Sequence, residues 1–160
     1  MSVAFVKEES AETAAEIDFP DRPISPFPNL VTEAGLQALT KALAGARAAF
    51  DAAQKIDDVG ERRRQTALAL RDMRYFAERL ESAKPMPPAA PGNTIAFGHS
   101  VTFVRDDGRR QVFKIVGEDE ADPRSGSISY VSPVARALIG KSVGDVVFVN
   151  DHEIEVVAVA

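Results

Sequence analysis

The spacing of apolar residues between positions 36 and 53 constrains the fold of this chain more than any other feature. Apolar residues recur there in alternating steps of three and four, at Leu36, Leu39, Leu43, Ala46, Phe50 and Ala53. This period predicts a helix with the apolar seam of a coiled coil. Thr32 is suited to the N-cap of that helix, and Glu33 is favourable in its first turn.

A second apolar seam follows at Leu70, Met73, Ala77 and Leu80, with Tyr75 and Phe76 beside it. It ends before the stretch KPMPPAAPG, whose prolines cannot continue a helix. Because the turn between the two segments is short, we expect an antiparallel helical hairpin over residues 31–84. Each arm of roughly 25 residues would be roughly 35 to 40 Å long, which predicts a projecting rod.

The last third of the chain has the two-residue period of β-strands. Short runs rich in valine, isoleucine and phenylalanine are separated by turn-forming residues; they are HSVTFV, RQVFKIVG, SISYV, DVVFV and EIEVVAV. One interruption, SPVARALIG, predicts a short helix with Ser132 at the N-cap, Pro133 at the first position and Gly140 after the last turn. We expect an antiparallel sheet with this helix on one face.

These patterns predict an α+β protein with a helical hairpin (31–84), a proline-rich linker (85–91) and a β-sheet domain (92–160). Residues 1–30 carry six acidic residues against two basic ones and contain four prolines. A segment of this composition buries little apolar surface, so we expect a disordered or loosely docked arm.

Composition narrows the classes of function. Cysteine is absent from the 160 residues, which excludes disulfides, thiolate catalysis and thiolate zinc sites. The net charge of -5 argues against independent binding of DNA through its phosphates. The sequence has neither a run of apolar residues that could span a membrane nor a secretory signal, so we expect a cytoplasmic protein without membrane contact.

Residues 97–147 contain three motifs that resemble those of a known protein family. The motifs IVGEDEAD, IS..SP.ARALIGK and VGD, in that order and spacing, are similar to the C-terminal domain of the Gre family of bacterial transcription factors. The stretch VTEAGLQAL resembles, more weakly, the start of the coiled coil of that family. The resemblance implies that residues 92–160 form an FKBP-like domain.

The resemblance also implies a mechanism. In Gre factors the FKBP-like domain docks on the rim of the RNA polymerase secondary channel while the coiled coil enters it. Two acids at the tip, in a D-x-x-E arrangement, help to hold a second Mg²⁺ of the polymerase near the 3′ end of the nascent RNA, where backtracked RNA is cut. The chain would then be an accessory factor that binds no cofactor of its own. Exposed members of SPVARALIGK would be docking contacts, namely Ser132, Pro133, Arg136 and Lys141.

The predicted tip, KIDDVGERRR, matches this motif in part. Asp58 and Glu61 have the D-x-x-E spacing, but Gly60 and the run Arg62, Arg63, Arg64 depart from the family pattern. Each helix is also roughly six to eight residues shorter than in the family, which withdraws the tip by about 10 Å. The alternative is a capping box, in which Asp58 accepts from the Glu61 amide and Glu61 bonds back. The arginines are either a solvated helix face or contacts to RNA phosphate in the channel.

Three further sites have structural interpretations. His99 and His152 are expected at the surface or at a sheet edge rather than on a metal. Gly117 to Asp122 is expected to be a solvated turn that leads to the docking surface. Val134, Leu138 and Ile139 are expected on the buried side of the short helix.

Four functions remain open. The leading one is a Gre-like elongation regulator, with or without stimulation of RNA cleavage. The second is a short-armed competitor of other channel-binding factors. The third is an FKBP-like prolyl isomerase, although Phe97, Phe103, Phe113, Tyr130 and Phe148 are all explained as strand core or cross-strand pairs. The fourth is a structural adaptor.

Overall fold

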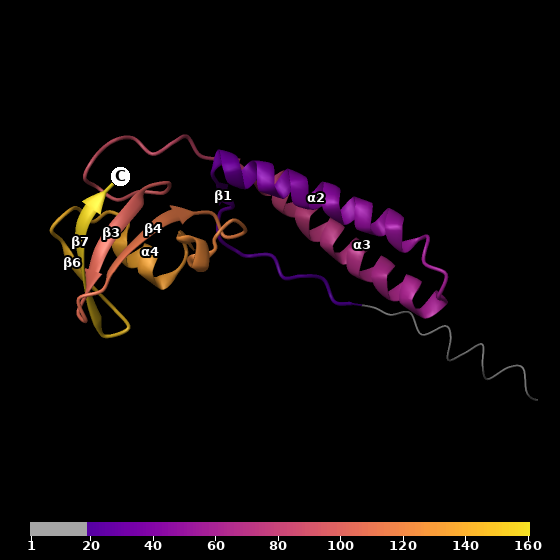
Figure 1. Cartoon of the computed structure of the whole chain (residues 1–160). Helices are drawn as coiled ribbons and strands as arrows, with labels where there is room; N and C mark the ends of the chain where they lie inside the picture. The colour runs from indigo at the N-terminus through magenta and orange to yellow at the C-terminus, as the bar shows by residue number, and fades with distance from the viewer. Residues whose placement is uncertain (1–18) are drawn as a thin grey trace, which may run out of the picture. The chain divides into compact units, whose positions relative to one another are not determined.

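A computed structural model describes residues 19–160 of the chain (Figure 1). Residues 1–18, the larger part of the predicted arm, lie outside the described residues. The chain divides into two compact units. Among the described residues, one unit holds residues 19–24 together with Ala42–Ala77, and the other holds Ser25–Lys41 together with Glu78–Ala160. Contacts therefore group the base of the hairpin with the sheet domain, which differs from the predicted boundaries at 84 and 92.

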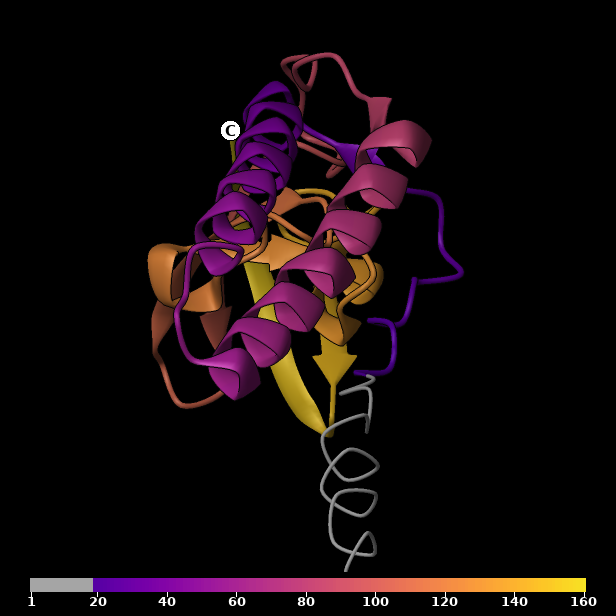
Figure 2. The same ribbon diagram turned by 90° about the vertical axis from the view of Figure 1, so that its right-hand side faces the viewer.

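Helices α2 (Glu33–Ala53) and α3 (Val59–Ser82) form the predicted hairpin and lie side by side in Figures 1 and 2. The Gly35 amide donates to Thr32 Oγ1 over 3.0 Å, which confirms Thr32 as the N-cap of α2. The predicted seam of α2 is also confirmed, because its six residues are all buried or half-buried.

The predicted seam of α3 is confirmed at Met73 and Leu80, which are half-buried, and wrong at Leu70 and Ala77. Ala69 is buried, whereas Leu70 is 37% exposed and Ala77 is exposed as well. The long side chains of Arg62 and Gln65 are half-buried on the same side as Ala69. Polar residues with long side chains therefore also contribute to the less exposed face of this helix.

The described part of the predicted arm, residues 19–30, makes defined contacts. Within the first unit, Asp21 pairs with Arg74 at 2.7 Å, and Arg22 pairs with Asp72 at 3.3 Å. The Arg22 guanidinium also lies 3.8 Å from the centroid of the Tyr75 ring. Two ion pairs and a cation–π contact thus hold Asp21 and Arg22 against α3.

A short parallel ladder joins the two ends of the hairpin within the second unit. Strand β1 (Leu30–Val31) pairs with β2 (Lys84–Pro85). The Lys84 amide donates to Asn29 O over 2.8 Å, and the Met86 amide donates to Val31 O over 2.9 Å. Pro85 lies between these two donors, where its lack of an N–H is tolerated. The predicted linker, 85–91, thus begins inside a strand.

The sheet has five strands in the order β5-β4-β3-β7-β6. Its members are β3 (Ser100–Arg105), β4 (Arg110–Val116), β5 (Ser127–Ser129), β6 (Val146–Val149) and β7 (His152–Val159), which match the five predicted strands. All neighbours are antiparallel except β4 and β5, which run parallel, so the prediction of a purely antiparallel sheet is wrong at this edge. The chain between these two strands, including the 3-10 helix η1 (Pro123–Ser125), provides the crossover that a parallel pair needs.

Helix α4 (Pro133–Leu138) is the predicted short helix, and Figure 1 shows it beside the sheet. Ser132 Oγ accepts from the Ala135 amide over 3.3 Å, and Gly140 has a φ of 85°, as the sequence predicts for the two ends of this helix. One apolar core lies between helix and sheet; its buried members include Val101, Phe103, Ile115, Ala135, Leu138, Ile154 and Val156.

Candidate functional site

The loop between α2 and α3 holds the candidate tip acids. The Glu61 amide donates to Asp58 Oδ2 over 2.7 Å, so Asp58 caps the N-terminus of α3. The Glu61 carboxylate does not return this bond. It accepts from Gln65 Nε2 over 2.7 Å and lies 3.4 Å from Arg64. The N-cap role of Asp58 is confirmed, and the reciprocal half of the predicted capping box is wrong because Glu61 bonds along its own helix.

The three tip arginines differ from one another. Arg62 is half-buried and donates to the carbonyl oxygen of Ile56 over 2.8 Å, so it ties the loop to the start of α3. Arg64 pairs with Glu61, and Arg63 and Arg64 are exposed. The interpretation of all three as one solvated helix face is therefore wrong for Arg62.

Asp57, Asp58 and Glu61 are all exposed at this tip. Within residues 19–160, no group of three or more histidine or acidic side chains is arranged to hold a metal ion. The tip thus presents three exposed acidic side chains, two of which are engaged in local hydrogen bonds.

The short helix α4 presents a second candidate surface. Pro133, Arg136 and Lys141 are exposed, as is expected of docking contacts, whereas Ser132 is half-buried and serves as the N-cap. Leu138 is buried as predicted and Val134 is half-buried, but Ile139 is exposed, so its predicted burial is wrong. Ile139 follows the last helical residue, where the chain turns away from the core toward Gly140.

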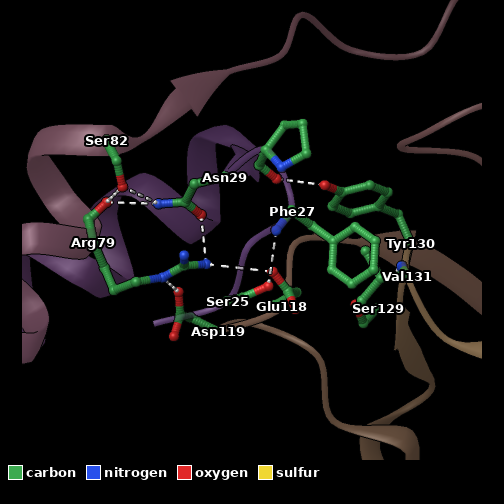
Figure 3. A network of polar contacts seen from close by, with 11 residues as sticks. Ser25, Phe27, Asn29, Arg79, Ser82, Glu118, Asp119, Ser129, Tyr130 and Val131 are labelled. Atoms are coloured by element: carbon green, nitrogen blue, oxygen red, sulfur yellow. Dashed lines mark hydrogen bonds and ion pairs between the residues drawn. The ribbon is translucent and has the colours of Figure 1, made fainter. Parts of the chain in front are cut away.

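A third site joins the hairpin base to the sheet domain, and it is drawn in Figure 3. Arg79 of α3 is only 2% exposed. Its Nε donates to Asp119 Oδ2 over 2.6 Å, and its guanidinium lies 3.7 Å from Glu118 Oε2. Asn29 completes the network, because its Oδ1 accepts from Arg79 over 2.8 Å and its Nδ2 donates to Arg79 O over 2.7 Å. A buried guanidinium thus joins segments that are far apart in the sequence.

Glu120, the next residue along, binds the start of α2. Its carboxylate accepts from the Thr32 amide over 3.0 Å and also from the Thr32 hydroxyl. A negative charge at this position also suits the positive end of the helix dipole. We call Glu118, Asp119 and Glu120 the acidic clamp, because they hold both ends of the hairpin. The turn predicted within Gly117 to Asp122 is present at residues 118–120, but the predicted solvation is wrong for their carboxylates, which contact Arg79 and Thr32.

Two glycines leave room for the contacts of the acidic clamp. A Cβ atom on Gly117 would lie 2.3 Å from the backbone oxygen of Leu30, and one on Gly35 would lie 1.9 Å from Glu120 Oε2. Both distances are well inside van der Waals contact. The backbone approach at Gly117 therefore requires a residue without a side chain.

Tyr130 adds a contact between the sheet domain and the segment that precedes β1. Its hydroxyl donates to the carbonyl oxygen of Pro28, and its ring meets Phe97 edge-on at a centroid distance of 5.8 Å. Burial raises the pKa of Tyr130 above its usual value, and the nearby Glu118 carboxylate adds to this increase in pKa. The neutral phenol is thus the form that the folded protein favours.

The sequence patterns did not predict the roles of Arg79, Asn29 and the acidic clamp. One signal was present: Arg79 follows Ala69 and Phe76 at helical spacing, so a charge falls on the buried side of α3. A charge on an apolar face needs a partner. Nothing local in the sequence indicated that Asp119 and Glu118, about forty residues later, would supply it.

The two histidines behave differently. His99 is buried, with Nδ1 accepting from the Ala96 amide over 3.0 Å and Nε2 lying 2.8 Å from the oxygen of Ala90. Its predicted surface location is wrong, because the ring holds the proline-rich segment against the sheet. His152 is exposed and lies 3.0 Å from Asp106, as expected of a surface histidine.

The aromatic residues of the sheet domain do not form an open proline pocket. Phe103 is buried and stacks on Phe113 with centroids 6.0 Å apart, and Phe97 packs on Tyr130. Phe148 is 69% exposed and lies opposite Glu153 on β7, so of its two predicted roles the cross-strand pair is confirmed and the strand core is wrong. A cavity of about 530 Å³ does exist in the second unit, but Phe97 is its one aromatic lining residue; the others include Thr32, Gln37, Met86, Pro87, Pro88 and Lys114.

No helix in residues 19–160 combines the length and apolar character needed to span a membrane.

Residues 90–160 match the family described as "Transcription elongation factor, GreA/GreB, C-term". Transcription elongation factor GreA of Methylobacterium nodulans is 38% identical over 120 residues, which are 72% of this chain and 71% of that protein. GreB of Neisseria meningitidis serogroup B is 42% identical over 95 residues, 56% of this chain and 58% of that protein. GreA of Beijerinckia indica is 53% identical over 60 residues, 37% of this chain and 38% of that protein. The matches to these last two relatives thus span about two fifths to three fifths of their length.

Among solved structures, GreA factor homolog 1 of Thermus thermophilus matches with a TM-score of 0.40 and 25% identity, covering 84% of this chain and 99% of that one.

Proposed function

Since this chain belongs to the GreA/GreB family of transcription elongation factors, we propose that it binds RNA polymerase at the rim of the secondary channel and modulates elongation. The protein is an accessory factor, and the chemistry belongs to the polymerase. It works in the cytoplasm beside the transcribing enzyme. The observation that carries the proposal is the exposed surface of α4 on a domain to which the hairpin base is fixed by the acidic clamp.

The docking surface that we assign consists of Pro133, Arg136 and Lys141, with Ile139 added from the structure. These side chains are exposed, while Ala135 and Leu138 anchor the same helix in the core. Helix α4 and the turn after it thus present two apolar and two cationic side chains, which suits a protein partner with acidic groups. Ser132 contributes by fixing the start of α4 and not by direct contact.

The hairpin tip is proposed to enter the channel. Asp58 and Glu61 supply hard carboxylate oxygens of the kind that Mg²⁺ prefers, so the donor set fits the second Mg²⁺ of the polymerase. That ion, when bound, activates the water that attacks backtracked RNA. Asp58 is held in place by the Glu61 amide, and the exposed Arg63 and Arg64 follow five and six residues later in the first turns of α3, where they can meet RNA phosphate near the 3′ end.

One observation favours a second candidate, a competitor that occupies the channel without promoting cleavage. Both tip acids are engaged in local bonds: Asp58 caps α3, and Glu61 accepts from Gln65. Presenting either carboxylate to a metal ion would weaken these bonds. A short hairpin with committed acids can still exclude other channel-binding factors.

Backtracked elongation complexes with labelled RNA separate the two candidates. If the tip supplies metal ligands, adding the protein with Mg²⁺ shortens the RNA faster, and Asp58→Asn removes most of that gain while keeping the cap. Glu61→Gln should act in the same direction. If the protein is a competitor, the RNA is not shortened, and the protein instead slows a GreA-type cleavage factor in the same reaction.

Docking is tested separately by binding to core polymerase. Arg136→Glu and Lys141→Glu should each weaken binding by about tenfold, because a charge is reversed at the interface. The matched control is Arg109→Glu, an exposed arginine in the turn between β3 and β4. Equal binding by all three variants, or no binding by the unaltered protein, would contradict the proposal.

A further inference from the structure

Strand β6 ends the sheet with an unprotected edge. Among residues 19–160 it pairs only with β7, so its other side presents unpaired backbone groups. Its sequence, VVFV, is uncharged and has high β propensity. Val146 is 46% exposed and Phe148 is 69% exposed. The opposite edge, β5, is only three residues long and has serine at both ends. Short, polar edges discourage pairing, and β6 lacks that protection.

The register of β6 and β7 fixes which backbone groups face outward. The two strands are joined by Asn150 and Asp151, both with positive φ, and Val149 pairs with His152. In a hairpin with a two-residue turn, the residues that flank the turn exchange hydrogen bonds, and so does every second pair after them. Val147 and Val149 therefore bond to β7. The N–H and C=O groups of Val146 and Phe148 point to the open edge.

We propose that this edge binds a second copy of the chain, with the two β6 strands antiparallel about a twofold axis at Val147. In that register, Val146 of each copy lies opposite Phe148 of the other. These are the residues whose backbone groups face outward, so each Val146–Phe148 pair can exchange hydrogen bonds in both directions. The backbone and side-chain requirements are met by the same register.

The side chains fit this arrangement on both faces of the sheet. Val146 and Phe148 lie on the face opposite the buried Val147, so each copy covers an exposed aromatic ring of the other with a valine. Val147 of each copy meets its equivalent on the core side. A contact in which the same patch serves both partners is the usual form of a twofold dimer.

The charges near β6 do not oppose the pairing. Asp145 falls opposite Val149 of the second copy, and its carboxylate already accepts from the Ser142 amide over 2.7 Å. Glu153 and Glu155 lie on β7, one strand farther from the edge, opposite Phe148 and Val146. No acid faces an acid across the twofold axis in this register. The inference is independent of polymerase binding.

The test is sedimentation velocity of the full chain from low micromolar to about 100 μM, the range in which a small interface associates. The expected result is a shift from the 17.2 kDa monomer toward twice that mass. Phe148→Glu should weaken self-association at least about tenfold, because it places a charge in the interface. Val146→Pro should have a similar effect, since it removes one outward N–H and leaves the bonds to β7 in place.

The matched control is Val112→Glu. Val112 is 56% exposed and lies on the same face of the sheet, but on β4, away from the β6 edge. Circular dichroism establishes that each variant is folded. Hydrogen exchange should show protection of the Val146 and Phe148 amides that rises with protein concentration. A protein that stays monomeric at the highest concentration, or a dimer that survives both edge variants, overturns the inference.

Discussion

Two acidic clusters in this protein have similar composition and opposite surroundings. At the hairpin tip, Asp57, Asp58 and Glu61 are exposed, and the bonds of the latter two go to residues within the same turn of chain. At the hairpin base, the acidic clamp binds Arg79 and Thr32, which are 40 and 88 residues away in the sequence. The tip acids stabilise one helix end, whereas the base acids join two segments of the fold.

This difference decides what each cluster can do. An exposed carboxylate loses less free energy than a buried one when its local bond is broken, because water compensates part of the loss. A carboxylate paired with a buried guanidinium cannot, because removal of either partner leaves a charge in a poorly solvated site. The tip acids are thus free to exchange partners, whereas the base acids join the two ends of the hairpin to the sheet domain within the second unit.

The largest effect should come from removing the buried cation. Arg79→Ala leaves Asp119 and Glu118 without this guanidinium, and Glu118 Oε2 is a buried atom that has no hydrogen-bond donor among the described residues. We expect a loss of about 3 kcal/mol in the free energy of unfolding, measured by urea denaturation. The matched control is Arg74→Ala, whose exposed ion pair with Asp21 contributes about 0.5 kcal/mol.

If Arg79→Ala and Arg74→Ala lowered the free energy of unfolding equally, the proposed difference between buried and exposed ion pairs would be wrong. Arg79→Lys sharpens the test, since it keeps the charge but not the planar fork that bonds Asp119 and Asn29. Its stability should lie between those of the unaltered protein and Arg79→Ala.

A second prediction concerns the close approach of two backbones at the base. Gly117→Ala puts a methyl group 2.3 Å from the oxygen of Leu30, a clash that must separate β1 from the acidic clamp. We expect destabilisation of about 2 kcal/mol. Gly45→Ala is the control: it lies in α2 with no atom within 4 Å of the added Cβ, so it should stabilise the protein by about 1 kcal/mol. Thermal denaturation of both variants should give shifts of opposite sign.

The same contrast explains which parts of the fold were predictable from sequence. The seam of α2, the caps at Thr32, Asp58 and Ser132, and the five strands all follow from interactions between residues close in the chain. Periodicity and capping preferences record such interactions directly. At the tip, the N-cap role of Asp58 was predictable for this reason.

Features that depend on distant segments could not be predicted in this way. The β1–β2 ladder pairs Leu30 with Lys84, and β5 runs parallel to β4, yet two-residue and three-residue strands carry no signal of their partner or direction. The acidic clamp could not be predicted for the same reason. An acid-rich turn is expected to be solvated unless it is known that Arg79 lies beside it. In α3, a small residue, Ala69, took the contact position that leucine was expected to hold.

A third prediction separates the cap from the charge at the tip. Asp58→Ala removes the acceptor of the Glu61 amide and should cost about 1 kcal/mol of stability. Asp58→Asn retains an acceptor and should cost only a few tenths of a kcal/mol, because asparagine is also a good N-cap. Differential scanning calorimetry measures both. If the two variants are equally destabilised, the role of Asp58 is electrostatic, and the tip resembles the base more closely than the structure indicates.

The smallest predicted effect is a change in the pH dependence of stability, which arises from Tyr130 at the hairpin base. Its folded-state pKa is raised above the usual 10.0 by burial and by Glu118, so the folded protein retains the phenol proton at a pH where the unfolded chain releases it. The stability that this difference contributes is fully present below pH 10.0 and is lost as the pH rises through the folded-state pKa. Urea denaturation from neutral to strongly alkaline pH should therefore show a steeper decline for the unaltered protein than for Tyr130→Phe, which has no phenol to titrate. A parallel decline of the two proteins would contradict this prediction. It would mean that the Tyr130 phenol is well solvated in the folded protein and that its hydrogen bond to the Pro28 carbonyl oxygen does not form in solution.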